Sequence, residues 1–156
     1  MITVSVKDRT PELMQKLQAA VEQFVVKGAA YIEGELVKES AGKKTGRSYP
    51  RGKEAVHTAS APGESPANDS SNLYGSIQII SENSLEAKIG TVVEYAVYLE
   101  YGASAPATRK VKKTGEAVMG PHMGGMKPRP LWAKTAAESL PTLENMLEAE
   151  VRKANR

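Results

Sequence analysis

The residues of this chain that could do chemistry are few, and its two histidines come first. Imidazole nitrogens bind zinc or transfer protons where carboxylates, cysteines or a nucleophile stand at a fixed spacing from them. His57 and His122 both lie in predicted loops without such neighbours, and the chain has no cysteine. We therefore predict no catalytic residues, no metal site and no disulfide, with His122 an ordinary loop residue.

A second candidate is a phosphate-binding loop at residues 42–45, Gly-Lys-Lys-Thr. The phosphate-binding template requires a glycine five residues before this glycine and a serine or threonine directly after the first lysine. Val37 and Lys44 occupy those two places. The predicted helix also precedes the loop, so its N-terminal amides do not face a phosphate. We reject nucleotide binding and expect no cofactor.

Positive charge gathers in two stretches, although the net charge of the whole chain is only +3. Residues 41–56 and 103–127 each hold five basic residues and one acidic residue, and both contain the tetrad Lys-Lys-Thr-Gly. Either tetrad alone is most simply a solvated turn. Basic loop tips also attract phosphates without reading bases. The candidate contacts to DNA or to acidic partner surfaces are Lys43, Lys44, Arg47, Arg51, Lys53, Arg109, Lys110, Lys112 and Lys113.

Length and hydropathy favour one soluble domain. The chain has 156 residues, enough for a single core. No apolar run approaches the roughly 20 residues that span a bilayer. Residues 1–7 are too short and too polar for a signal peptide. We expect a protein that is made in the cytoplasm and has no membrane partner.

The first half of the chain predicts a strand, a long helix and a loop. Residues 2–6 alternate as ITVSV, the period of a half-buried strand. A helix follows to about residue 39, with Thr10 as its expected N-cap and Pro11 at its first position. Residues 41–69 are rich in Gly, Pro, Ser and Lys and predict a mobile loop, in which 48–49 and 55–59 suit a protruding hairpin.

The second half predicts a hairpin and two more helices. After a helical turn at 70–74, residues 76–80 and 85–90 alternate about the turn 81–84. Residues 93–102 predict a short tyrosine-rich helix that ends at Gly102. A second mobile loop covers 103–127, and a last helix starts at Pro130, with a kink or brief break expected near 139–140 before Pro141.

These elements together predict an α+β fold. We expect a small antiparallel sheet packed by the long N-terminal helix, the tyrosine-rich helix and the C-terminal helix. The chain has only one Phe and one Trp, so its core is lean, and a neighbouring subunit is one way to complete the burial of the long helix. Trp132 then serves either as a core residue or as an interface anchor.

Three short blocks, in this order over residues 56–136, carry a resemblance to a known family. They are HTASAPGESPA at 57–67 followed by Ser-Asn-Leu at 71–73, VEYAVYLEYG at 93–102, and MKPRPLW at 126–132. This trio resembles the tail-completion proteins of long-tailed bacteriophages, which are also called neck or head–tail joining proteins. The matching residues, expected to fix the fold, are Ser60, Pro62, Gly63, Tyr95, Ala96, Glu100, Gly102, Arg129, Pro130 and Ala136.

The resemblance implies a structural virion protein and not an enzyme. Such proteins join the completed tail to the filled head, assemble as rings, with six copies expected here, and contact tail-terminator or connector proteins. Genome DNA passes through the ring without sequence readout. We expect Glu100 to pair with Arg129, and Tyr95, Tyr98, Gly102 and Trp132 to act in the fold or the interface.

The chain departs from the family pattern in two places. Asn72 replaces a glycine before Leu73, and the connection at 103–127 is longer than usual. Two other classes of function remain open. One is a small basic DNA-binding module of phage or prophage origin, and the other is a small hydrolase whose site the sequence does not reveal.

Overall fold

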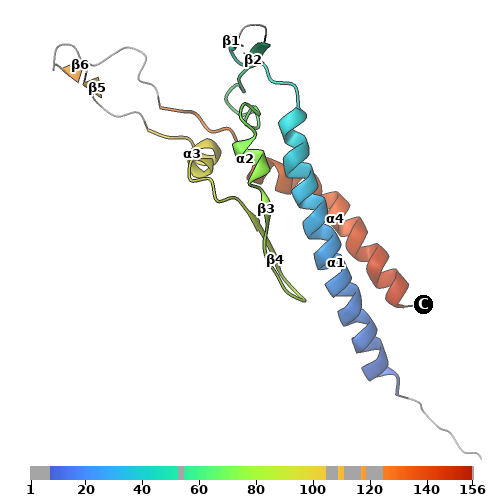
Figure 1. The fold of residues 1–156 in the computed structure, drawn as a ribbon. Helices are drawn as coiled ribbons and strands as arrows, with labels where there is room; N and C mark the ends of the chain where they lie inside the picture. Colours follow the sequence, from blue (N-terminus) through green and yellow to red (C-terminus); the bar gives the residue numbers. More distant parts are fainter. Residues whose placement is uncertain (1–7, 53–54, 105–108, 111–116, 119–124, 156) are drawn as a thin grey trace, which may run out of the picture.

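The computed structural model describes residues 8–52, 55–104, 109–110, 117–118 and 125–155 (Figure 1). Helix α1, Thr10–Lys38, is followed by a 3-10 turn, η1, Glu39–Ala41. This confirms the long helix. The predicted N-cap is wrong, because Thr10 is already helical and its N–H donates to the Asp8 carboxylate at 2.9 Å. Asp8 thus satisfies an amide that has no partner within the helix. The strand expected at 2–6 lies outside the described residues.

Helix α4, Trp132–Ala154, packs along α1 in the opposite direction (Figure 1). Gly28 allows the close approach, since a Cβ there would lie 3.4 Å from Leu143. Lys27 and Glu150 form an ion pair of 2.8 Å across the two helices. Of the kink or brief break expected near 139–140, the break is wrong, because α4 continues through Pro141, and the kink stays a prediction. Packing of the buried neighbours Thr135 and Ser139 holds the helix despite the missing N–H donor.

The strands form three separate antiparallel hairpins, which confirms the α+β class and the predicted hairpins at 48–59 and 76–90. The first two hairpins are β1, Ser48–Arg51, with β2, Ala55–Thr58, and β3, Gln78–Glu82, with β4, Ala87–Gly90. The third consists of β5, Arg109–Lys110, and β6, Ala117–Val118. The turn of the second hairpin lies later than predicted, because the Asn83 side chain accepts the N–H groups of Leu85 and Glu86 at 3.0 and 2.9 Å.

Two short helices complete the fold, α2, Asn72–Gly75, and α3, Ala96–Tyr101. The core lies where these two helices meet the C-terminal end of α1 and the start of α4. Its buried apolar side chains are Leu36, Leu73, Tyr74, Ile77, Ala96 and Leu131. Trp132 packs against this core while staying half-exposed, so it contributes to both the core and the surface.

The described part of the chain leaves much apolar surface uncovered. Eight apolar side chains there are buried, whereas fifteen large ones are exposed. The exposed ones gather on α3, on the hairpin β3–β4 and on the two long helices. Such a surface is typical of a protein that binds another chain. No helix in the described residues is long and apolar enough to span a membrane.

Candidate nucleic-acid and assembly interface

The hairpin β1–β2 carries the first group of predicted basic contacts. The hydrogen-bonded pairing continues beyond the ends of the two strands, because Gly46 N donates to Ala59 O and Ala59 N donates to Arg47 O, both at 3.0 Å. A Cβ on Gly46 would lie 2.5 Å from Ala59 O, so only glycine permits this approach. Across the strands Tyr49 faces His57, with ring centroids 5.2 Å apart. These contacts therefore fix the position of the hairpin near which the cations lie.

Arg51 pairs with Asp69 within the same chain, and its predicted contact with DNA or a partner stays a prediction. The guanidinium forms an ion pair with the Asp69 carboxylate and donates to the Asp69 backbone oxygen at 2.7 Å. Nδ1 of His57 lies 3.4 Å from the same carboxylate. His57 thus contacts an acidic residue of its own loop. These contacts join the hairpin to the segment before α2.

Lys44 is also turned inward. Its side chain is half-buried, and its ammonium donates to the backbone oxygen of Glu39 at 3.1 Å. Burial lowers the pKa of Lys44. The exposed cations that remain in the segment leading into β1, within the described residues, are Lys43 and Arg47. Lys53 lies outside those residues.

The second basic group is only partly described. Arg109 and Lys110 form β5, while Lys112 and Lys113 lie outside the described residues. Figure 1 draws β5–β6 well away from β1–β2. The contacts predicted for this second group with DNA or acidic partner surfaces stay a prediction.

A cluster of Ser65, Lys134 and Glu39 resembles a nucleophile–base arrangement in composition only. The Lys134 ammonium lies 3.0 Å from Glu39 Oε2 and 3.4 Å from Ser65 Oγ, and Ser65 Oγ donates to the same carboxylate. The hydrogen bond to Glu39 raises the pKa of Lys134, and that from Ser65 lowers the pKa of Glu39. A protonated lysine cannot act as a general base, and Ser65 is buried. The cluster instead joins α1, the loop and α4.

Hydrogen bonds to Glu64 connect the same loop to the residues before β1. Its carboxylate accepts hydrogen bonds from Thr45 Oγ1 at 2.5 Å, Thr45 N at 3.1 Å and Ala61 N at 2.7 Å. These bonds, led by that from the Thr45 hydroxyl, lower the pKa of Glu64 to about 2. No group of three or more potential metal ligands occurs in the described part of the chain.

At the junction between α3 and α4, one carboxylate accepts several backbone hydrogen bonds. Glu100 Oε2 accepts the N–H groups of Leu131 at 2.7 Å and Trp132 at 3.1 Å, and Oε1 accepts that of Ala133 at 2.9 Å. The first turn of α4 has no side-chain cap of its own. A carboxylate is favoured there, because the N-terminal amides lack partners and carry partial positive charge. Glu100 therefore caps a distant helix.

The predicted pair of Glu100 with Arg129 is wrong, although the two segments do meet. Arg129 N donates to Leu99 O at 2.7 Å, and its Nε donates to Ser60 O at 3.2 Å. Gly102 adopts φ +80°, and a Cβ there would lie 2.6 Å from Met126 O. The link to the first block is completed by Gly63 N, which donates to Pro128 O at 3.0 Å. All three sequence blocks thus converge on this junction.

Two cavities flank α3. A cavity of about 410 Å³ with a mixed polar and apolar lining lies towards the basic hairpin, with His57, Asp69, Tyr95 and Arg129 among its lining residues. A more apolar groove of about 400 Å³ lies on another side, lined in part by Ile89, Val93, Val97, Tyr101 and Trp132. Of the residues predicted to act in the fold or the interface, Tyr95 and Tyr98 are 44 % and 56 % exposed, and the neighbouring Tyr101 is 78 % exposed.

Sequence reasoning missed the acidic partners Glu39, Glu64 and Asp69 and the basic partner Lys134. No local pattern marks them, because the pairs Arg51–Asp69, Thr45–Glu64 and Lys134–Glu39 join residues 18 or more positions apart. Compared with models of known families, with curated proteins and with solved structures, the chain has no significant match.

Proposed function

We propose that this chain is a structural protein of the neck of a long-tailed phage, with no catalytic role and no cofactor. It is made in the host cytoplasm and incorporated into the virion, where it completes the tail and joins it to the DNA-filled head. Its partners are further copies of itself in a ring of six, tail-terminator or connector proteins, and the genome DNA in the channel. No membrane partner is involved.

The convergence of the three sequence blocks is the observation that carries this proposal. Residues 60–63, 95–102 and 126–132 resemble neck proteins separately, yet they build one junction around the Glu100 cap. A junction of this kind explains why those residue types are needed together. Glu100 must reach three amides, Gly102 must adopt a positive φ, and Arg129 must reach Ser60.

The surface of the chain also suits a ring subunit. The exposed apolar side chains of α3 and of α1 need a partner. Lys43 and Arg47 stand exposed in the segment that leads into β1 and suit sequence-blind contact with phosphates or with acidic neighbours. An annular protein that lets DNA pass requires contacts of this weak and salt-sensitive kind.

The state of assembly tests the proposal. The full-length protein is weighed in solution by light scattering, and the same sample is imaged in negative stain. We expect a mass near six subunits and closed rings with a stained centre. A monomer that neither forms rings nor joins isolated tails or connectors would contradict the proposal.

A small DNA-binding module is the second candidate, favoured by exposed Lys43 and Arg47 beside the half-exposed ring of Tyr49. It requires that the isolated monomer bind duplex DNA with an affinity that falls steeply with salt. Binding by a monomer, with no ring at any protein concentration, would favour this candidate over the neck protein.

A further inference from the structure

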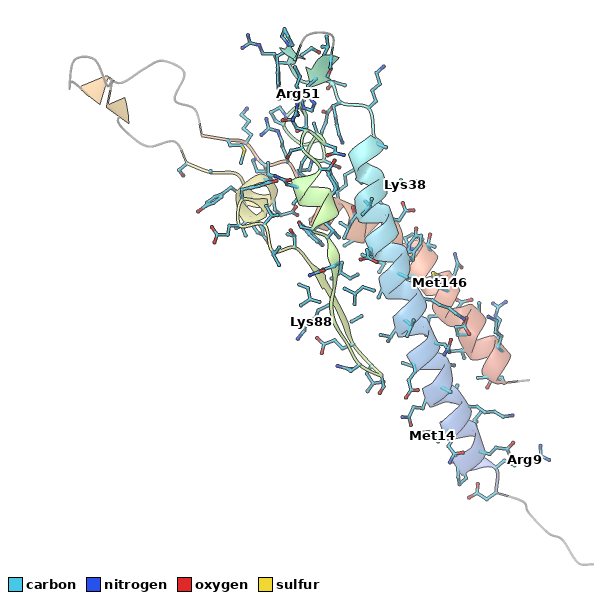
Figure 2. The ribbon with its side chains drawn as sticks, in the orientation of Figure 1. Arg9, Met14, Lys38, Arg51, Lys88 and Met146 are labelled. Carbon is cyan, nitrogen blue, oxygen red and sulfur yellow. The ribbon has the colours of Figure 1, made fainter. Side chains whose placement is uncertain are left out.

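The N-terminal end of α1 is the first of two apolar surfaces that the described residues leave uncovered. Lys27 pairs with Glu150, four residues before α4 ends, and α1 continues beyond that end (Figure 1). On this projecting end Leu13 is 43 % and Met14 62 % exposed, and Figure 2 shows Met14 away from α4. We call residues 10–19 the α1 tip. Isolated turns of helix are marginal in water, so this tip needs an apolar partner.

The second surface is the apolar groove beside α3, which β4, residues 91–94 and the start of α4 complete. Val92 and Val97 on its wall are 75 % and 61 % exposed, and Tyr101 is 78 % exposed. We call it the α3 groove. Its volume of about 400 Å³ gives room for several side chains of a helix.

The area of the exposed patch around the groove suits a protein partner. Val92, Val97, Tyr98 and Tyr101 expose on the order of 400 Å² together, since one aromatic side chain alone buries about 150–250 Å². A stable complex buries roughly 800 Å² on each partner. The patch therefore supplies about half of such an interface, and a helix lying across it supplies contacts along the groove edges.

We propose that the α1 tip of one copy inserts into the α3 groove of the next copy. The inference rests on the proposed neck function, because it names the contact through which the ring closes. The N-terminal end of α1 and helix α3 lie well apart in Figure 1, so one copy cannot join its own tip to its own groove. Unlike surfaces that meet head to tail give a ring when the rotation closes.

The binding mode is a helix in an apolar groove. Leu13 and Leu17 are four residues apart and therefore share one face of α1, with Met14 beside them. Anchors at this spacing are the usual means by which a helix fills a groove. The same face is covered by α4 further along α1, where Gly28 meets Leu143. A second copy would thus cover the part of this face of α1 that α4 does not reach.

Cross-linking tests the contact directly, since the chain has no cysteine. Full-length Met14→Cys is mixed with full-length Val97→Cys and treated with a short bismaleimide. The matched control pairs Val26→Cys with Val97→Cys, because Val26 is 46 % exposed on the same helix but lies about 120° around it from Met14. We expect at least tenfold more cross-linked heterodimer from the first pair. Equal yields would overturn the inference, whether or not rings form.

A complementation experiment tests the head-to-tail geometry. Met14→Glu places a charge on the α1 tip, and Val97→Glu places a charge in the α3 groove. Both side chains are exposed, so we expect both variants to fold. Each variant alone is expected to stop at the monomer, and their mixture is expected to form a complex of two chains through the one intact pair. Val26→Glu should assemble like the unmodified chain. Association of either single variant with itself to the unmodified level would overturn the inference.

The outcomes separate this inference from the proposed function. Rings without the tip–groove cross-link would refute the contact and leave the neck function standing. Cross-linked open chains without rings would support the contact and count against the neck function.

Discussion

The carboxylate of Glu100 accepts the backbone N–H of Leu131 at 2.7 Å, across 31 residues of sequence. Two further amides of the first turn of α4 bind the same side chain. A single residue of α3 therefore sets where the C-terminal helix begins. Because residues 60–63 bind the same segment, the start of α4 also positions the loop that carries the basic hairpin.

Replacement of Glu100 tests this cap. Glu100→Gln keeps one oxygen acceptor but loses the charge and places an amide donor against the N–H groups of α4. We expect the free energy of unfolding to fall by about 1–2 kcal/mol, the usual cost of a lost helix cap. Glu94→Gln, an exposed residue just before α3, is the control and should stay within about 0.5 kcal/mol. Equal thermal stability of the two variants would refute the cap.

Replacement by alanine is expected to change the free energy of unfolding in opposite directions at Gly102 and at Gly34. Gly102→Ala forces a side chain onto φ +80° and brings its Cβ 2.6 Å from Met126 O, so we expect a loss of about 1–3 kcal/mol. Gly34 lies within α1, four residues before its end, where a Cβ would meet no atom within 4 Å. Gly34→Ala should stabilise the protein by about 0.5–1 kcal/mol, because alanine favours helix. Denaturant titration measures both, and a gain from Gly102→Ala would contradict the junction geometry.

The stability of the loop depends on pH through Glu64. Its pKa falls from 4.5 to about 2 on folding, so the unfolded chain binds more protons between those values. The stabilising contribution is complete above about pH 5 and disappears as the pH falls towards 2. Thermal unfolding of Glu64→Gln and of the unmodified chain should therefore differ most near neutral pH and converge near pH 2. A difference that stays constant with pH would exclude this role.

The basic hairpin predicts a salt-dependent contact with DNA. Charge reversal of Lys43 and Arg47 together removes two exposed cations of the segment that leads into β1. In an anisotropy titration with labelled duplex, we expect the slope of log affinity against log salt to decrease by about 2, near 0.9 per lost phosphate contact. Lys88→Glu on β4, far from the hairpin in Figure 2, is the matched control. Equal slopes for the two variants would place DNA elsewhere.

Local periodicity was sufficient to predict α1, α4 and the hairpin β3–β4, and short strands within residues 41–69 predicted β1–β2. Their apolar spacing follows directly from which face each element buries, as at Gly28 and Leu143. The polar contacts could not be predicted, because a charge such as Glu100 or Asp69 finds its partner only after distant segments have packed. The prediction of a break at Pro141 was wrong for the same reason, because packing of α4 against α1 offsets the lost hydrogen bond.

The position of the protein in a phage particle tests the central claim most directly. Antibodies against the purified chain, carrying gold, are applied to particles released from cells that encode it, and the particles are imaged by electron microscopy. We expect gold at the junction between the head and the tail, and none on the head or along the tail. Complete particles that carry no label, with the chain left in the cell lysate, would contradict the neck function.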